Sequence, residues 1–200
     1  MKTIDIKGSL RTGKGKTAAK HLRKEGLVPC ILYGNKTENI DFSVPASELR
    51  GLIYTPNSYI VNLNINGTSY TGILREAQYH PVTDEPLHLD FFHVDPGKPV
   101  AIDIPVAISG NSEGVKQGGK LQILNRRLKV SALPADLPDN LPVDITNLGL
   151  GKSISVGELL FDKLTILTPK TAIVCAVKMT RAAIGAAQAA AAAAAAEAKK

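Results

Sequence analysis

The sequence predicts a mostly β protein with short helices (α+β), made of a small N-terminal β-barrel domain, an all-β C-terminal domain and an Ala-rich tail. Three observations lead to this prediction. Apolar and polar residues alternate in many short runs, which is the pattern of half-buried strands. Gly and Pro residues separate these runs. Of the 200 residues, 44% are hydrophobic, so the chain can bury a real core.

The first run of the chain illustrates both kinds of element. Ile4, Ile6 and Leu10 alternate with polar residues and predict a strand. The segment TGKGKT then ends that strand. Helix-forming residues follow over 18–25, with Thr17 as the expected N-cap and Gly26 as the stop, so a short helix is predicted there.

The rest of the first domain, expected to span 1–95, is predicted to be mainly short strands. The dipeptide Asn66-Gly67 is the strongest short hairpin signal in the chain. A second short helix is expected over 45–53. So many short strands favour a small, closed or nearly closed barrel. The expected strands cover 27–34, 40–44, 59–65, 69–77 and 87–92.

The composition changes near residue 96. Eight of the nine aromatic residues and all four His lie in 1–95. Residues 96–99 are expected to form a linker, because the prolines and glycine of DPGKP cannot continue a strand. A second domain over 100–178 is predicted to be a β-sandwich or distorted barrel, with one strand running through 120–133. Residues 179–200 form an Ala-rich, low-complexity tail that lacks an amphipathic face.

Charge is distributed unevenly along the first domain. Seven basic residues and no acid occur in 7–24, whereas 25–95 contains Lys36, Arg50 and Arg75 against nine acids. Such polarity attracts a polyanion to one face and sets its orientation. Two interpretations remain open on charge alone: a polyanion-binding segment, or a solvated basic loop and helix face. The basic residues are Lys7, Arg11, Lys14, Lys16, Lys20, Arg23 and Lys24.

Enzymatic motifs are incomplete in this chain. A P-loop requires the pattern GxxxxGK followed by Ser or Thr, whose hydroxyl binds Mg²⁺. The frame that starts at Gly8 has Gly13-Lys14 at the correct spacing, but Gly15 follows in place of the Ser or Thr. In the alternative frame, Leu10 replaces the first glycine. The histidines lack the spacing of a zinc site, no Ser/His/Asp arrangement is visible, and both cysteines lie in apolar runs. We therefore expect no enzyme, metal, cofactor or small-molecule substrate.

The same segment suits RNA better. Glycines such as Gly13 and Gly15 let the main chain approach phosphates closely, and the helix after them directs its positive end toward an anion. His88 and Asp90 lie two residues apart on a predicted strand and so share a face. This pair is either a polar surface pair or a set of hydrogen-bonding groups for base edges and 2′-hydroxyls. Tyr33 and Tyr79 are candidates for base stacking or for the core.

Three segments together resemble a known family. They are Arg11–Gly34, Gln78–Pro81 and Leu87–Phe91, in this order and spacing. They are similar to the bacterial large-subunit ribosomal protein family numbered twenty-five, which binds 5S rRNA, in its two-domain CTC or general stress form. The resemblance covers essentially all of 1–178. It implies a barrel domain that docks on the loop E region and reads its widened minor groove.

The resemblance also implies which residues contact RNA. Gly13 and Gly15 would shape the loop that carries Lys14, and His80 matches the family's His-Pro turn. Two positions depart from the family, because Tyr79 and Lys20 stand where Arg is common. At Tyr79 a phosphate contact is either lost or replaced by stacking, and at Lys20 bidentate geometry is lost. Arg75 is the candidate to compensate. The implied contacts are Arg11, Lys16, Lys20, Arg23, Tyr33, Gln78, His88 and Asp90.

These expectations define the partners. The protein is expected to be cytoplasmic, on the ribosome, with 5S rRNA as its main partner and neighbouring ribosomal proteins as further partners. No apolar run reaches the ~18 residues of a membrane helix, so no membrane is expected. The competing classes are an enzyme, which the incomplete motifs argue against, and a protein–protein scaffold whose working part is the second domain.

Overall fold

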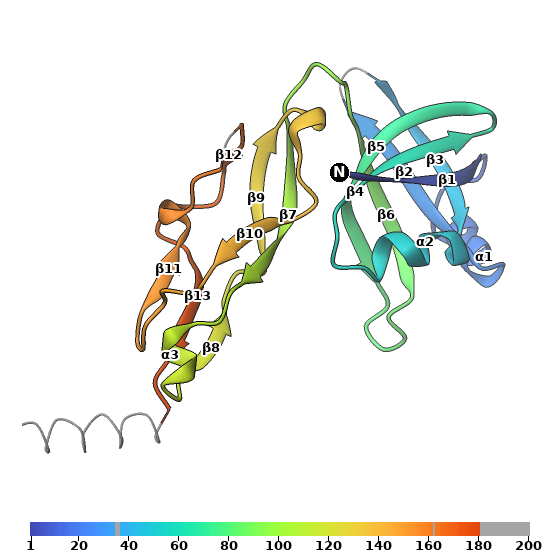
Figure 1. Cartoon of the computed structure of the whole chain (residues 1–200). Helices are drawn as coiled ribbons and strands as arrows, with labels where there is room; N and C mark the ends of the chain where they lie inside the picture. The colour runs from blue at the N-terminus through green and yellow to red at the C-terminus, as the bar shows by residue number, and fades with distance from the viewer. Residues whose placement is uncertain (35–36, 162, 181–200) are drawn as a thin grey trace, which may run out of the picture. The chain divides into compact units, whose positions relative to one another are not determined.

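The computed structural model describes residues 1–34, 37–161 and 163–180 (Figure 1). The predicted tail lies outside these residues from position 181 onward. Within them the fold is mostly β with short helices, as predicted, and it divides into two compact units. The first comprises Met1–Ile104 and Val130–Asp139, and the second comprises the remaining described residues. The first unit thus extends past the proposed linker, and the domain limits proposed from sequence stay a prediction.

Six strands of the first unit close into a barrel, which confirms the predicted architecture (Figure 1). β1 is parallel to β4 and β2 is parallel to β6, while the other neighbours are antiparallel. In this closed order β1 and β6 lie three strands apart in either direction, on opposite sides of the barrel. The order is β1 (Lys2–Leu10), β3 (Thr37–Pro45), β2 (Leu27–Gly34), β6 (Pro86–His93), β5 (Thr68–Tyr79) and β4 (Tyr59–Ile65).

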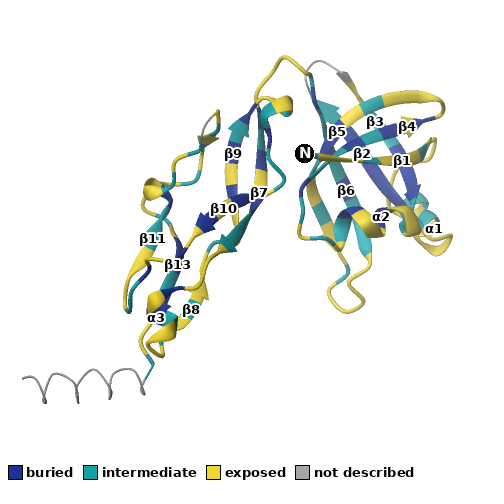
Figure 2. Ribbon diagram, in the orientation of Figure 1, coloured by how far each residue is buried: buried dark blue, intermediate teal, exposed yellow. Residues whose placement is uncertain are grey.

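The barrel interior is filled by the alternate, inward-facing residues of its strands. Phe42 and Phe91 are fully buried there, with their ring centroids 5.8 Å apart. The short helix α2 (Ala46–Ile53) adds Leu49 and Leu52 to the same core. Figure 2 shows buried positions along the barrel strands, and the burial alternates most clearly in β4 and β6. The interior is therefore a packed core, and ligand chemistry has to occur on the outer surface.

The helix predicted at 18–25 is present, but its start was predicted wrongly. α1 runs over Lys16–Lys24, and its N-cap is Gly15 with φ 96° and ψ 179°, not Thr17. That backbone conformation is essentially restricted to glycine, so the chain turns into the helix at this residue. The predicted stop is correct, since Gly26 follows with φ 76°.

The second unit and the segments that join it to the first form two sheets. One has the order β10-β7-β9-β12 and the other β11-β13-β8. Residues of both sheets, including Val143 and Val177, pack into one core. The strands are β7 (Val100–Ser109), β8 (Lys120–Ile123), β9 (Arg127–Ala132), β10 (Leu141–Asp144), β11 (Ser153–Ser155), β12 (Thr165–Ile166) and β13 (Ile173–Lys178), with short helical turns at α3 (Glu113–Lys116), η1 (Pro134–Asp136) and η2 (Val156–Glu158).

The single strand predicted over 120–133 is two strands in different sheets. β8 ends at Ile123 and β9 begins at Arg127. Between them the side chain of Asn125 donates to the carbonyl of Ile173 at 2.7 Å, and Val106 donates its amide to the carbonyl of Arg126. These two bonds mark the point at which the chain passes from the β13 sheet to the β7 sheet. The alternation of apolar and polar residues continues through this point, so the sequence pattern does not show that the strand is interrupted.

Candidate nucleic-acid interface

Polar residues gather on the outer face of β5 and β6. Gln78 lies directly opposite His88 across the antiparallel β5–β6 pair, and Asp90 is the next outward residue of β6. Because Leu89 is completely buried in the barrel, its neighbours His88 and Asp90 must point outward. The structure therefore brings together three of the residues expected to contact RNA.

His88 and Asp90 lie in close polar contact on this face. His88 Nδ1 lies 2.7 Å from Asp90 Oδ1, with both side chains little more than a quarter exposed. The Nδ1 atom of the imidazole therefore faces the carboxylate, and Nε2 is the second polar atom of the ring. The second carboxylate oxygen of Asp90 remains an acceptor for an amino or hydroxyl group. The pair thus presents oriented polar atoms, in line with the predicted shared face.

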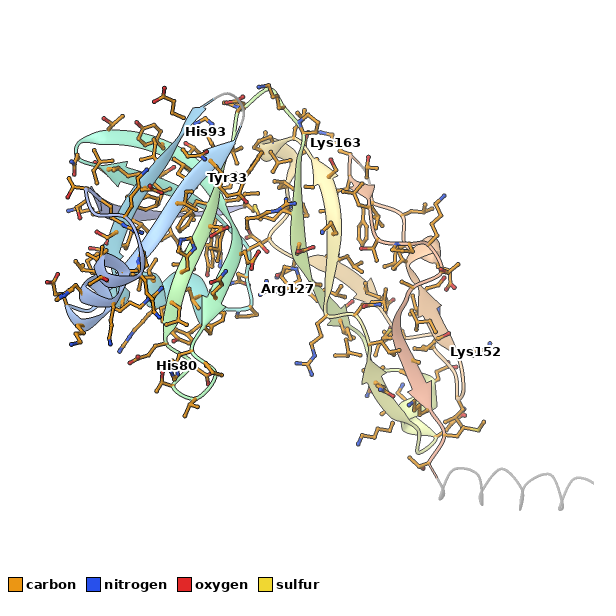
Figure 3. The ribbon with its side chains drawn as sticks, turned by 180° about the vertical axis from the view of Figure 1, so that it is seen from behind. Tyr33, His80, His93, Arg127, Lys152 and Lys163 are labelled. Atoms are coloured by element: carbon orange, nitrogen blue, oxygen red, sulfur yellow. The ribbon has the colours of Figure 1, made fainter. Side chains whose placement is uncertain are left out.

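Tyr33 lies farther along the same face. It is opposite Phe92 in the parallel β2–β6 pair, and the two rings meet edge to face with centroids 5.9 Å apart. Gly34 fits beside them because a Cβ there would come within 2.9 Å of the Phe92 ring. Figure 3 places Tyr33 at the end of the barrel opposite His80. Tyr33 is half-buried, so only part of its ring is open for stacking on a base.

The basic helix α1 is fixed to this face by one side chain. Arg23 Nε donates to the carbonyl of Leu87 in β6 at 3.1 Å. Leu22 and two alanines face the barrel, yet no residue of α1 is fully buried. Lys16 and Lys20 are exposed and, four residues apart, lie on one side of the helix. Arg23 therefore positions the helix, whereas the lysines are open to a ligand.

The loop between β1 and α1 is held by β3. The amide of Arg11 donates to the carbonyl of Asp41, and Lys14 Nζ forms an ion pair with the Asp41 carboxylate at 3.2 Å. The Arg11 guanidinium donates to the carbonyl of Gly13 at 3.1 Å, while its Nε is buried without a hydrogen-bond partner among the described residues. Asp41 was not predicted as a site residue. Alternation along the strand indicates only that it faces outward, and it does not reveal the contact with the loop.

His80 has a structural task in the β5–β6 turn. Its Nδ1 accepts the amides of Val82 and Thr83 at 3.3 and 3.2 Å, so the ring proton belongs on Nε2. Its own backbone closes the same turn with Glu85 and Asp84. The role of the His-Pro motif was open from sequence. Here the imidazole acts as an acceptor that shapes the turn.

Two other basic residues make different contacts. Arg75, at the irregularity in β5, donates from Nη1 to the carbonyl of Ala101 at 3.3 Å. Lys7 belongs to β1, which lies across the barrel from β6, and lines a surface hollow with Glu48 and Asn62. The basic run 7–24 is therefore not one continuous surface. Its contribution to the β5–β6 face begins with the loop after β1.

The remaining reactive groups give no catalytic arrangement. Cys30 and Cys175 are free and buried, as the apolar runs around them predicted. Burial raises the pKa of each thiol, which keeps it protonated. Among the described residues, no group of three or more His, Cys, Asp or Glu side chains is placed to hold a metal ion. Within the same residues, no helix is both long and apolar enough to cross a membrane.

Comparison with known proteins identifies relatives of both parts of the chain. Residues 6–91 match the model of the ribosomal L25p family, and residues 99–181 match that of the ribosomal protein TL5 C-terminal domain. "Large ribosomal subunit protein bL25" of Phocaeicola vulgatus is 51% identical over 193 residues, covering 94% of this chain and 98% of that protein. The proteins of the same name from Porphyromonas gingivalis and Bacteroides thetaiotaomicron are 50% and 47% identical, with the same shares of both chains covered.

The fold and these matches define a two-domain ribosomal protein of the large subunit. The chain belongs to the ribosomal L25p family, in the form that carries a TL5-type C-terminal domain. Association with the ribosome and its rRNA follows from this membership. The relatives are structural ribosomal proteins, which confirms the prediction that the chain is not an enzyme.

Proposed function

We propose that the first unit binds 5S rRNA at its loop E region and so anchors the protein in the large ribosomal subunit. The resemblance of the first domain to 5S rRNA-binding ribosomal proteins suggests this RNA. One structural observation carries the proposal. The outward polar group of Gln78, His88 and Asp90 lies on the strand pair to which Arg23 attaches the basic helix.

The two parts of this face have different tasks. Lys16 and Lys20 contact phosphates, which supplies affinity and salt dependence but little sequence information. Asp90 and Gln78 offer an acceptor and an amide to base edges or 2′-hydroxyls across a widened minor groove. His88 holds the Asp90 carboxylate in place through its 2.7 Å contact. Tyr33 extends the face with a partly open ring.

Equilibrium binding of the full chain to 5S rRNA over a range of salt concentrations tests this division. Lys16→Ala should weaken binding and lower the slope of log affinity against log salt by about one unit. Asp90→Ala should weaken binding with little change in slope. The sign of the affinity change in Asp90→Ala distinguishes the two kinds of contact. If the surface bound RNA by electrostatic contacts alone, removing this negative charge would strengthen binding.

Lys7→Ala is the matched control. It removes the same exposed charge from a strand on the opposite side of the barrel, so its effect on slope should be clearly smaller. Equal slopes for wild type and Lys16→Ala would remove Lys16 from the phosphate contacts. Tighter binding by Asp90→Ala would exclude its role as an acceptor for RNA.

A further inference from the structure

A second basic surface lies in the other unit, at the end of the three-stranded sheet. β13 and β8 are antiparallel, and their register places Lys178 directly opposite Lys120. Both side chains are exposed, whereas the adjacent Val177 is buried in the core of the unit. The two lysines therefore share the outer face of the sheet.

This outer face carries no carboxylate at the neighbouring register positions. Gln122 lies opposite Ala176, and Ala176 lies opposite Ser153 of β11. Directly opposed side chains in an antiparallel pair approach to about 5 Å, so two lysines there repel each other. No ion pair among the described residues involves either lysine. The pair costs stability in the isolated protein and becomes favourable when an anion lies between the ammonium groups.

The acidic residues described in this unit form no ion pair with Lys120 or Lys178. Glu158 caps η2 through Ser155 at 2.8 Å, and Asp144 accepts from Thr146 at 2.5 Å. Glu113 lies at the start of α3 and forms no ion pair with the two lysines. The charge of the outer face is therefore left for a partner to neutralise.

The loop before Lys120 holds that residue in a fixed place. Gly119 donates its amide to the carbonyl of Gly114 at 2.8 Å, and Thr180, two residues after Lys178, donates its hydroxyl to the carbonyl of Gly118 at 2.7 Å. Figure 1 shows α3 and the start of β8 beside the last residues of β13. Because amides of this loop are already bonded, the lysine ammonium groups rather than the main chain are available to a ligand.

We propose that the outer face formed by Lys120, Gln122, Ser153, Ala176 and Lys178 is a second RNA contact, which binds the phosphate backbone of rRNA in the large subunit. A sheet face with two cations and neutral neighbouring side chains complements a sugar–phosphate chain, and it offers little for base recognition. Membership of the ribosome places the unit among polyanions. This inference concerns the second unit and does not depend on how the first unit recognises 5S rRNA.

Binding of the full chain to an RNA duplex of mixed sequence tests the proposal. The background variant is Lys16→Ala with Lys20→Ala, which reduces binding through the barrel. In it, Lys120→Gln with Lys178→Gln should lower the salt slope by about two further units. The matched control, Lys129→Gln with Lys170→Gln, removes two exposed lysines of the same unit that lie off this face and should change the slope much less. Equal changes in the two pairs would overturn the proposal.

Thermal unfolding separates loss of binding from loss of structure. Relief of the opposed charges should leave the Lys120→Gln, Lys178→Gln variant at least as stable as wild type. A lower melting temperature would show that the lysines support the fold, and it would contradict an anion-binding role.

Cross-linking identifies the partner in assembled large subunits. Both native cysteines are buried, so Lys120→Cys adds an accessible thiol that can carry a photo-cross-linker. Cross-links to rRNA are expected from this position and not from Lys129→Cys. Cross-links solely to a ribosomal protein would assign the face to a protein partner and overturn the proposal.

Discussion

Two glycine–lysine segments, 12–16 and 116–120, read alike in sequence but differ in structure. In the first, a Cβ added at Gly15 would have no neighbour within 4 Å, and the residue has φ 96°. In the second, a Cβ at Gly119 would come within 2.5 Å of Val177 and 2.6 Å of the Gly114 carbonyl. The first glycine is needed for its backbone conformation, and the second for close packing.

This difference determines which atoms of each segment are accessible to a ligand. Around Gly15 the space is open and no side chain caps the helix, so main chain and lysines are both accessible. Around Gly119 the backbone is enclosed and hydrogen-bonded, so ligand contacts are left to the flanking lysines. Composition alone does not separate the two cases, because Gly119 also packs against Val177 and Leu150, which are distant in the chain.

The largest effect is expected from Gly119→Ala. Its Cβ would overlap Val177 and the backbone of Gly114, and overpacking of this kind costs about 1–3 kcal/mol. The free energy of unfolding from urea titration measures it. Gly149→Ala is the control, because its Cβ would meet Lys152 at an ordinary 3.7 Å. Equal stability of the two variants would show that the segment is not closely packed.

A smaller and more local loss is expected from Gly15→Ala. Backbone strain at such a φ and ψ costs about 1–3 kcal/mol, but α1 has no fully buried residue, so its first turn can fray while the barrel stays folded. Affinity for 5S rRNA should fall more than the stability of the barrel. Gly51→Ala is the control inside α2, where no neighbour lies within 4 Å. A matching loss of global stability would contradict the local role.

His80 gives a test of the turn on the barrel side. His80→Ala removes the acceptor for two amides and should lower stability by about 1 kcal/mol. His80→Asn places an oxygen near the position of Nδ1 and should recover most of that loss. Thermal melting of the two variants measures the difference. If Asn fails to restore stability while 5S rRNA binding is lost in both, the imidazole contacts RNA directly.

The smallest effect concerns acid stability of the second unit. Hydrogen bonds from the Thr146 hydroxyl and amide lower the pKa of Asp144. A lowered folded pKa contributes stability that is present above the unfolded pKa of about 4 and is lost as pH falls through the folded pKa. Thr146→Val should therefore reduce the acid dependence of unfolding, and Thr146→Ser should preserve it. The two variants are compared by measuring the midpoint of unfolding at pH 6 and again below about pH 4.

Periodicity was enough to predict the barrel, because inward residues such as Phe42 and Leu89 recur at every second position. The Asn-Gly dipeptide predicted the hairpin at Asn66-Gly67, where both residues have positive φ. Periodicity did not place the start of α1, since that depends on the backbone conformation of Gly15 and not on the capping preference of Thr17.

The arrangement of the candidate site was less predictable. Strand spacing selected His88 and Asp90, the resemblance added Gln78, and the β5–β6 register brings the three together. The contacts that position the basic residues, Arg23 with Leu87 and Lys14 with Asp41, join segments distant in sequence. Nothing local specifies such pairs.

Closure of the barrel has a consequence for aggregation. Because β1 pairs with β4, each of the six strands has two neighbours, and the folded barrel offers no free edge to another chain. The four-stranded sheet of the second unit has two edges, but they are poor templates: β12 spans Thr165–Ile166, and β10 contains Pro142. The vulnerable state is a barrel in which β1 has not yet paired, since β4 then exposes an unpaired edge. Resistance to aggregation during folding therefore depends on how quickly β1 pairs with β4.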